Sequence, residues 1–495
     1  MMNSEGIDSR NLKEKTAQGL FWGFLSSGGM QLLNLIIGIF LARLLSPTEY
    51  GIVGMIAIFT LIATNLQESG FGVALVNVKD ITHNDYNSVF WFNVGMSLLL
   101  YLILFLCAPL IAAFFHQPCL VSLSRFVFLA LFFAAISISP NAMLARGLKM
   151  KEKAITSLSA LIISGTVGVV MAYKGFSYWS LATQQVLYSF VISIGRYYFP
   201  RWCPTFKVDF TPVKRMFSFS YKVLITAILT TVNNNVLTVI FGRWFPAQSV
   251  GNFTQANKWN TMANQLVVNT VAQVAQPVFT RVNDDGERQR RVFGKMLRFT
   301  AFLSFPAMFG LALIAPQLII AAIGDKWVDS IPLLQILCIS GAVIPLYTVY
   351  QNMFLSLGKS DIYMWLTIVQ IALLLTVVMA CHSLGFIAMV AAFACVNVLW
   401  LLAWQVFAYR LIGYRFTSML RDLLPFMLIA LAVMALTYFI TQHIHNIYLL
   451  MVVRVVIAGA LYTLTMKVTK AKIFEECIEF VRAFRHKSSG GSNKT

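Results

Sequence analysis

One stretch of the chain, residues 249–281, is long enough to cross a bilayer and yet carries many polar side chains. At helical spacing most of them share one stripe: Thr254, Lys258, Thr261, Gln265, Asn269, Gln273 and Gln276. The other side carries Phe253, Trp259, Met262, Leu266, Val267, Val271 and Val274. Polar side chains are costly in hydrocarbon, so the stripe must face protein or water. We interpret this helix as one wall of a polar binding cavity; the alternative is that its amides only hold it against neighbouring helices.

The composition indicates that this wall lies inside a membrane protein. The 495 residues are 58% hydrophobic and 12% charged, with a mean hydropathy of +0.73. A soluble protein carries about twice that charged fraction. The net charge of +19 does not indicate nucleic-acid binding, because the cations lie in short loops between apolar segments. No cleavable signal peptide is expected at the polar start, and the seven cysteines show neither paired nor metal-ligand spacing.

Apolar windows of about 20 residues predict an all-α polytopic protein with about 14 transmembrane helices. The predicted spans are 17–42, 50–69, 88–113, 121–145, 155–173, 177–199, 216–242, 249–280, 292–315, 331–357, 362–382, 385–409, 422–442 and 447–467. With the N-terminus inside, 30 of the 38 Lys and Arg residues fall on the inner side, four on outer loops and four within spans. Lys and Arg are enriched in cytoplasmic loops, so both termini are predicted to be cytoplasmic.

An internal repeat accompanies this alternation. Residues 41–53 match residues 241–253 at an offset of 200, which pairs Arg43 with Arg243 and Gly51 with Gly251. Residues 140–149 resemble residues 351–359 at an offset of 211. The repeat unit has six helices, an even number, so both copies insert the same way up and a site is expected between them. Arg43 and Arg243 are candidate gating residues, each expected to bind the last carbonyls of its own helix.

The repeat divides the chain into four parts. Residues 1–200 and 201–420 are predicted to form two six-helix lobes, and residues 421–467 an additional helix pair. Residues 468–495 are predicted to form an amphipathic helix on the inner leaflet, followed by a disordered tail.

Three segments carry a resemblance to a known family: KTAQGLFWGFLSSGGMQLLNLIIGIFLARLLSPTEYGIVGM at 15–55, QESGFGVALVN at 67–77 and APLIAAFFHQP at 108–118. They resemble the polysaccharide transporter, or Wzx-like, branch of the MOP flippase superfamily. That resemblance implies two lobes in a V, a central cationic cavity and alternating access. It implies a polyprenyl-diphosphate-linked oligosaccharide as substrate, flipped to the outer leaflet of the bacterial inner membrane for lipopolysaccharide O-antigen or other surface polysaccharide. It also implies glycan polymerase machinery as a partner.

A diphosphate-linked sugar requires cations at membrane depth with amide donors around them. The candidate substrate-binding residues are Lys258, Lys222, Arg298, Asn234, Gln265 and Asn269. The three cations could instead snorkel to the membrane surface, and Arg454 is interpreted as a structural or lipid-headgroup contact. Glu68 is expected to be the only acidic residue within or beside a span end. It would be a proton or cation carrier, a partner of a repeat-mate Lys or Arg, or a residue that caps a helix end at the inner interface. No cofactor is expected, and coupling to a proton or sodium gradient is left open.

Two other functions compete with the flippase. A multidrug or small-solute exporter of the same superfamily would be expected to bury an acidic residue in mid-membrane, and none is expected here. A membrane enzyme, such as a polyprenyl-linked glycan polymerase or transferase, would need a metal-binding acidic pair or a large outer loop. The only adjacent acids, Asp284 and Asp285, lie in a short inner loop. The sequence therefore favours a transporter that is not an enzyme.

Overall fold

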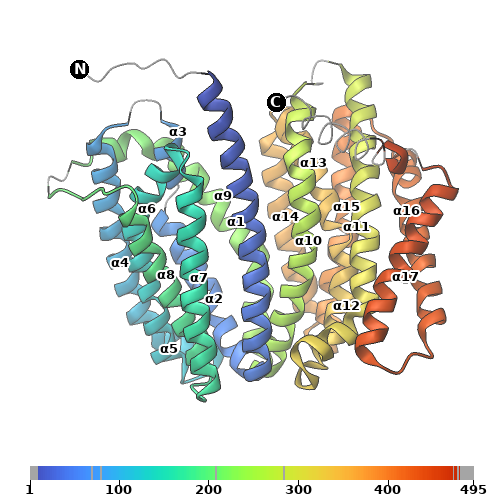
Figure 1. The fold of residues 1–495 in the computed structure, drawn as a ribbon, viewed down its shortest axis with the longest axis horizontal. Helices are drawn as coiled ribbons and strands as arrows, with labels where there is room; N and C mark the ends of the chain where they lie inside the picture. Colours follow the sequence, from blue (N-terminus) through green and yellow to red (C-terminus); the bar gives the residue numbers. More distant parts are fainter. Residues whose placement is uncertain are drawn as a thin grey trace, which may run out of the picture. The chain divides into compact units, whose positions relative to one another are not determined.

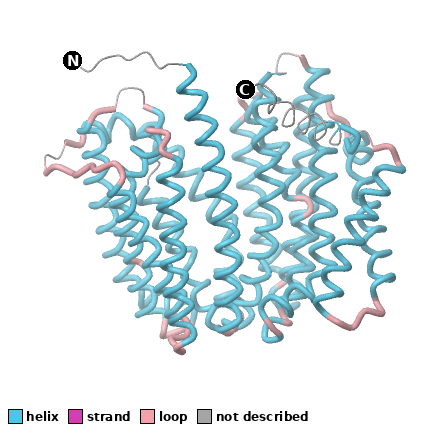
Figure 2. Tube along the Cα trace, viewed as in Figure 1, coloured by secondary structure: helices cyan, strands magenta, loops and turns pink. Residues whose placement is uncertain are grey.

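The computed structural model describes residues 9–68, 71–78, 81–206, 209–281, 285–471, 473–476 and 479, nearly all of them helical. Figure 1 shows the helices and Figure 2 the short loops that join most of them. The first part of the chain forms α1 (Ser9–Leu44), α2 (Pro47–Glu68), α3 (Phe71–Asn77), α4 (His83–Phe115), α5 (Leu120–Val127), α6 (Leu129–Arg146), α7 (Met150–Tyr173), α8 (Trp179–Tyr198) and α9 (Thr211–Trp244). The remainder forms α10 (Ala247–Arg281), α11 (Gly286–Ile323), α12 (Ser330–Gly341), α13 (Ile344–Ser356), α14 (Ser360–Ala380), α15 (Phe386–Ile412), α16 (Phe416–Thr441) and α17 (Ile447–Val468).

The predicted all-α membrane fold is confirmed. Each predicted span coincides with one helix or with two consecutive helices separated by a short break, as in α5–α6 and α12–α13. Within the described residues, eleven helical segments are long and apolar enough to cross a membrane. The predicted spans at α8, α9 and α10 are not among these eleven. Helices α8 and α10 are more polar, α10 being the helix with the polar stripe, whereas many side chains of α9 lie outside the described part of the structure.

The chain forms two compact units, residues 1–254 and 255–495. In the first unit α7 packs against α1 and α8, and α9 packs against α2 and α4. In the second unit α11 packs against α12, α16 and α17, so the predicted additional pair α16–α17 rests on a helix of the same unit. The predicted lobes divide at residue 200, where the sequence repeat divides. The compact units divide at residue 254, so α9 belongs to the first unit.

The repeat is visible in the backbone. Helix α1 ends at Leu44 and α2 begins at Pro47, while α9 ends at Trp244 and α10 begins at Ala247, which preserves the offset of 200. Residues with positive φ also recur at nearly constant offsets: His116 with Gly324, Leu148 with Gly358, Gly175 with Gly385, and Arg201 with Gly413. Equivalent turns therefore place a positive φ at matching points in the two copies.

The two matched turns contact each other inside the first unit. A β-carbon placed on Gly51 would lie 1.8 Å from the carbonyl oxygen of Ala247, and one placed on Gly251 would lie 1.8 Å from that of Pro47. The contacts are reciprocal, as a local twofold relation between parallel copies requires. Neither position can carry a side chain unless the backbones separate.

Candidate functional site

Helix α10 has two faces of different character. Its buried line contains Asn260, Asn264, Val267, Val271, Ala275 and Phe279. Its exposed line contains Thr261, Gln265, Asn269 and Gln273, which belong to the stripe expected from the sequence. These residues are exposed on the surface of their own unit. Lipid would leave the hydrogen-bonding groups of their side chains unsatisfied, so we expect them to face water or another polar surface. The role of Gln265 and Asn269 in substrate binding remains a prediction.

The other face of α10 corrects two expectations. Leu266, expected on the apolar side, is 67% exposed. Asn260 and Asn264, which the stripe did not include, are buried. Their spacing of four residues, continued by Val267 and Val271, is the signal in the sequence that could have identified this buried line.

Lys258 lies in the N-terminal half of α10, half-buried, between Thr254 and Thr261 on the polar stripe. Among the residues that the structure describes, no hydrogen bond or ion pair joins its ammonium group to another side chain. A partly buried cation without a counter-charge is costly. Lys258 is thus available to an anionic ligand.

Several arginines within the two units are used to hold helix ends instead. Their guanidinium groups donate to C-terminal carbonyls: Arg146 to Val76 of α3 at 3.3 Å, Arg243 to Phe114 of α4 at 2.6 Å, and Arg290 to Ile412 of α15 at 3.1 Å. The C-terminal end of a helix carries partial negative charge, which these cations neutralise.

The expectation for Arg243 was therefore wrong in one respect. Its guanidinium group binds the end of α4 rather than that of its own helix α9, and it also contacts the ring of His116 at 2.9 Å. Helix α4 ends beside Arg243 because α9 packs against it. Arg43, at the end of α1, is exposed. A gating role for the two arginines remains a prediction.

Arg298 has a partner that the sequence analysis missed. Its Nη1 lies 3.1 Å from Oδ1 of Asp422 in the first turns of α16, and the Tyr414 hydroxyl donates to Oδ2 of the same carboxylate at 2.6 Å. Asp422 is 8% exposed, so the expectation that Glu68 alone would lie near a span was wrong. Gly294 leaves room for the pair, because a β-carbon there would lie 2.8 Å from the carboxylate. Arg298 therefore has less free charge for a ligand than Lys258.

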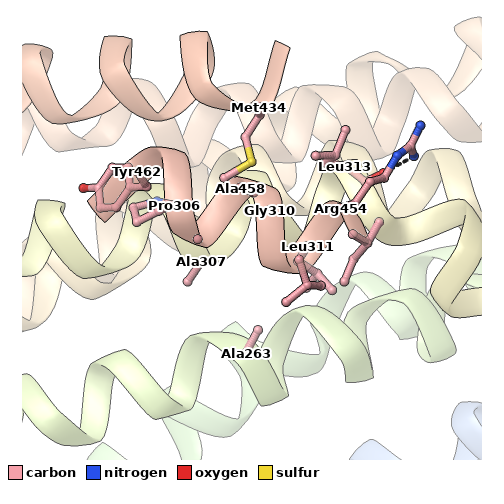
Figure 3. Close-up of a pocket in the computed structure, with 13 residues that line it drawn as sticks. Ala263, Pro306, Ala307, Gly310, Leu311, Leu313, Met434, Arg454, Ala458 and Tyr462 are labelled. Atoms are coloured by element: carbon pink, nitrogen blue, oxygen red, sulfur yellow. Dashed lines mark hydrogen bonds between the residues drawn. The ribbon is translucent and has the colours of Figure 1, made fainter. Parts of the chain in front are cut away.

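Arg454 borders an apolar pocket of about 360 Å³ within the second unit (Figure 3). The pocket is lined mainly by α11 and α17, including Pro306, Gly310, Ala458 and Tyr462. The guanidinium group points away from it, as Figure 3 shows, and donates to the Leu313 carbonyl and to Gln317, both at 3.0 Å. A third donation, to Thr441 at 3.2 Å, ties α17 to α16. The structural role expected of Arg454 agrees with these contacts.

Three predicted site residues have side chains outside the described part of the structure: Lys222, Asn234 and Glu68. Their backbones belong to α9 and to the last turn of α2. Their predicted roles are neither supported nor contradicted.

Comparisons with known proteins give the family context of this site. A model of the family described as polysaccharide biosynthesis protein matches residues 40–332. The succinoglycan biosynthesis transport protein ExoT of Rhizobium meliloti is 24% identical over 93% of this chain and 94% of its own length. The lipopolysaccharide biosynthesis protein WzxC of Escherichia coli is 24% identical over 71% of this chain and 72% of its own length.

Solved structures agree on the fold. The lipid II flippase MurJ, in an inward closed conformation, superposes with a TM-score of 0.71 at 14% identity, covering 91% of this chain and 99% of that one. An inward-facing multidrug resistance transporter of the MATE family, in the MOP superfamily, superposes with a TM-score of 0.63 at 16% identity, covering 78% and 94%. The fold is of the MOP type.

Proposed function

This chain belongs to the polysaccharide biosynthesis protein family, and from that premise we propose that it flips a polyprenyl-diphosphate-linked oligosaccharide from the cytoplasmic to the outer leaflet. Relatives that match most of the chain are named for the transport or biosynthesis of surface polysaccharides. The membrane-spanning fold suits movement of a lipid-linked substrate across a bilayer better than soluble chemistry.

The observation that carries the proposal is the polar line of α10 with Lys258. The exposed amide and hydroxyl groups of Thr261, Gln265, Asn269 and Gln273 can exchange hydrogen bonds with a hydroxylated glycan. Lys258 adds a positive charge without a partner in the described part of the chain, which suits a diphosphate. In alternating access the substrate binds from one side of the membrane and leaves on the other, so the site must bind it reversibly, as polar contacts allow.

The competing functions explain less of the structure. Asp422 is a buried acid of the kind an exporter of organic cations would use, but Arg298 and Tyr414 already occupy both of its oxygens. For an enzyme, the described residues contain no group of three or more His, Cys, Asp or Glu side chains that could hold a catalytic metal. We therefore favour transport, with glycan polymerase machinery as the partner that would use the product.

The test of the proposed function is delivery of glycan to the cell surface. Deletion of the gene should abolish the surface polysaccharide while the lipid-linked oligosaccharide accumulates in the membrane, because synthesis continues on the inner face and export stops. Extraction and quantification of the lipid-linked species, with surface labelling of the glycan, measures both. A deletion strain with normal surface glycan and no accumulated intermediate would contradict the function.

Topology gives a second expected result, since both termini are proposed to be cytoplasmic. In a variant without the seven native cysteines, Lys174→Cys and Lys326→Cys should react with a membrane-impermeant thiol reagent added from outside. Lys151→Cys and Arg288→Cys should react only after permeabilisation. All four side chains are exposed in the structure, so a difference in labelling would reflect the side of the membrane and not burial. Outside labelling at Lys151→Cys would refute the proposed orientation.

A further inference from the structure

A groove of about 440 Å³ is formed by the last turns of α15 and the first residues of α16. Its main wall is the face of α15 that carries Leu402, Val406 and Tyr409, which are spaced by four and three residues and so share one side of the helix. These side chains are 44%, 49% and 57% exposed. Phe416, the first residue of α16, adds another exposed ring to the lining. The groove is therefore largely apolar and open on the outside of the second unit.

The groove reaches from a membrane surface into the hydrocarbon. Helices α15 and α16 are both long and apolar enough to span a bilayer, and only residues 413–415 separate them. So short a connection stays at the interface, which places Arg415 at the level of the lipid headgroups. Val406 and Leu402 lie about 9 and 15 Å along α15 from its end. They are therefore at the depth of the acyl chains.

The headgroup end of the groove is positively charged. Arg415 lines the groove, and Arg410 is exposed on α15 one turn beyond Val406. Neither arginine forms an ion pair with an acidic side chain of the described residues. The last carbonyl of α15, of Ile412, would repel an anion, but it already accepts a hydrogen bond from Arg290 at 3.1 Å. This end of the groove therefore attracts an anion.

The polar groups near the groove have little to offer a glycan or a zwitterionic headgroup. Gln405 lines the groove but is 1% exposed; its Nε2 donates to the Tyr414 carbonyl at 2.7 Å and its Oε1 accepts from Tyr350 at 2.9 Å. Asp422 follows the turn in the sequence, but Arg298 and Tyr414 already occupy both of its oxygens. No free carboxylate among these residues receives the ammonium of a zwitterionic lipid.

We propose that this groove binds one anionic phospholipid, with its phosphate at Arg415 and an acyl chain on Leu402 and Val406. Basic pockets between transmembrane helices bind anionic headgroups in this way. With both termini cytoplasmic, as proposed, the lipid belongs to the inner leaflet. A lipid-linked diphosphate carries two adjacent phosphates, whereas the single arginine of the lining suits one phosphodiester. The proposal needs only the membrane position of α15 and α16 and goes beyond the flippase function.

Native mass spectrometry of the purified full-length protein tests the proposal, with dioleoyl phosphatidylglycerol or dioleoyl phosphatidylcholine added in detergent. We expect one phosphatidylglycerol to be retained at concentrations at which phosphatidylcholine is not. Arg415→Gln should weaken its binding about fivefold or more, because the variant loses the charge that holds the phosphate. Val406→Trp should also weaken binding, since the indole fills the place of the acyl chain. Both positions are exposed, so both variants should fold.

Arg288→Gln is the matched control. Arg288 is an exposed arginine at the beginning of α11, in the same unit but not in the groove, so its loss should leave phosphatidylglycerol binding at the wild-type level. Equal retention of the two phospholipids, or equal phosphatidylglycerol binding by the wild type and both groove variants, would overturn the proposal. Binding of a polyprenyl diphosphate at lower concentration, with the same dependence on Arg415, would also overturn it by assigning the groove to the carrier lipid. Glycan delivery tests the flippase function separately, and a groove without phospholipid would leave that function standing.

Discussion

Replacement of Lys258 by alanine is expected to reduce glycan flipping strongly while the amount of protein in the membrane stays normal. A hydrogen bond to a charged group contributes about 1.5–3 kcal/mol, which corresponds to roughly a 10- to 100-fold loss in apparent affinity for the lipid-linked substrate. Protein level should not fall, because Lys258 has no partner in the described structure whose loss would leave a buried charge. Transport into proteoliposomes at several substrate concentrations measures the effect.

The charge series at this position separates substrate attraction from packing. Lys258→Arg should retain part of the activity, since it keeps the charge and changes its geometry. Lys258→Glu should be worse than alanine, because repulsion of the diphosphate is added to the lost attraction. Lys174→Ala, an exposed lysine in a loop, is the control and should transport normally. If all three Lys258 variants transport at the wild-type rate, the residue is a snorkelling lysine and Lys222 and Arg298 become the next candidates.

Substitution of Gly51 or Gly251 by alanine is expected to destabilise the protein far more than glycine-to-alanine changes elsewhere. Each new methyl group would lie 1.8 Å from a backbone carbonyl, of Ala247 or of Pro47 respectively, and a backbone cannot move aside as a side chain can. Overpacking of this kind costs about 1–3 kcal/mol and sometimes more. The midpoint of thermal unfolding in detergent, followed by size-exclusion chromatography, should fall for both variants.

A control and a double variant sharpen this test. Gly95 in α4 has no atom within 4 Å of its would-be β-carbon, so Gly95→Ala should be neutral or stabilising, as alanine favours helix. The double variant should lose less stability than the sum of the two single losses, because one separation of the turns relieves both clashes. Gly51→Ala with the thermal stability of Gly95→Ala would show that the two turns do not touch as described.

The helices could be predicted from the sequence because few backbone structures are stable inside a membrane. A backbone in hydrocarbon must satisfy its hydrogen bonds within each segment, so apolar length alone located the spans. The two parallel copies could be predicted from the paired residues Arg43 with Arg243 and Gly51 with Gly251. The same offset of 200 relates the helix ends on both sides of these turns. The exposed polar line of α10 followed from the helical period.

The partners of the polar residues were decided by tertiary structure. Asp422 and Arg298 are 124 residues apart and meet only because α16 packs on α11. Arg243 binds the end of α4, which no periodicity of α9 could indicate. The buried amides of Asn260 and Asn264 lie against Gly341, at the end of α12, and their spacing on α10 could not indicate that neighbour. Local pattern fixes which way a side chain turns on its own helix, but the packing of distant helices determines the charge, carbonyl or gap that it meets.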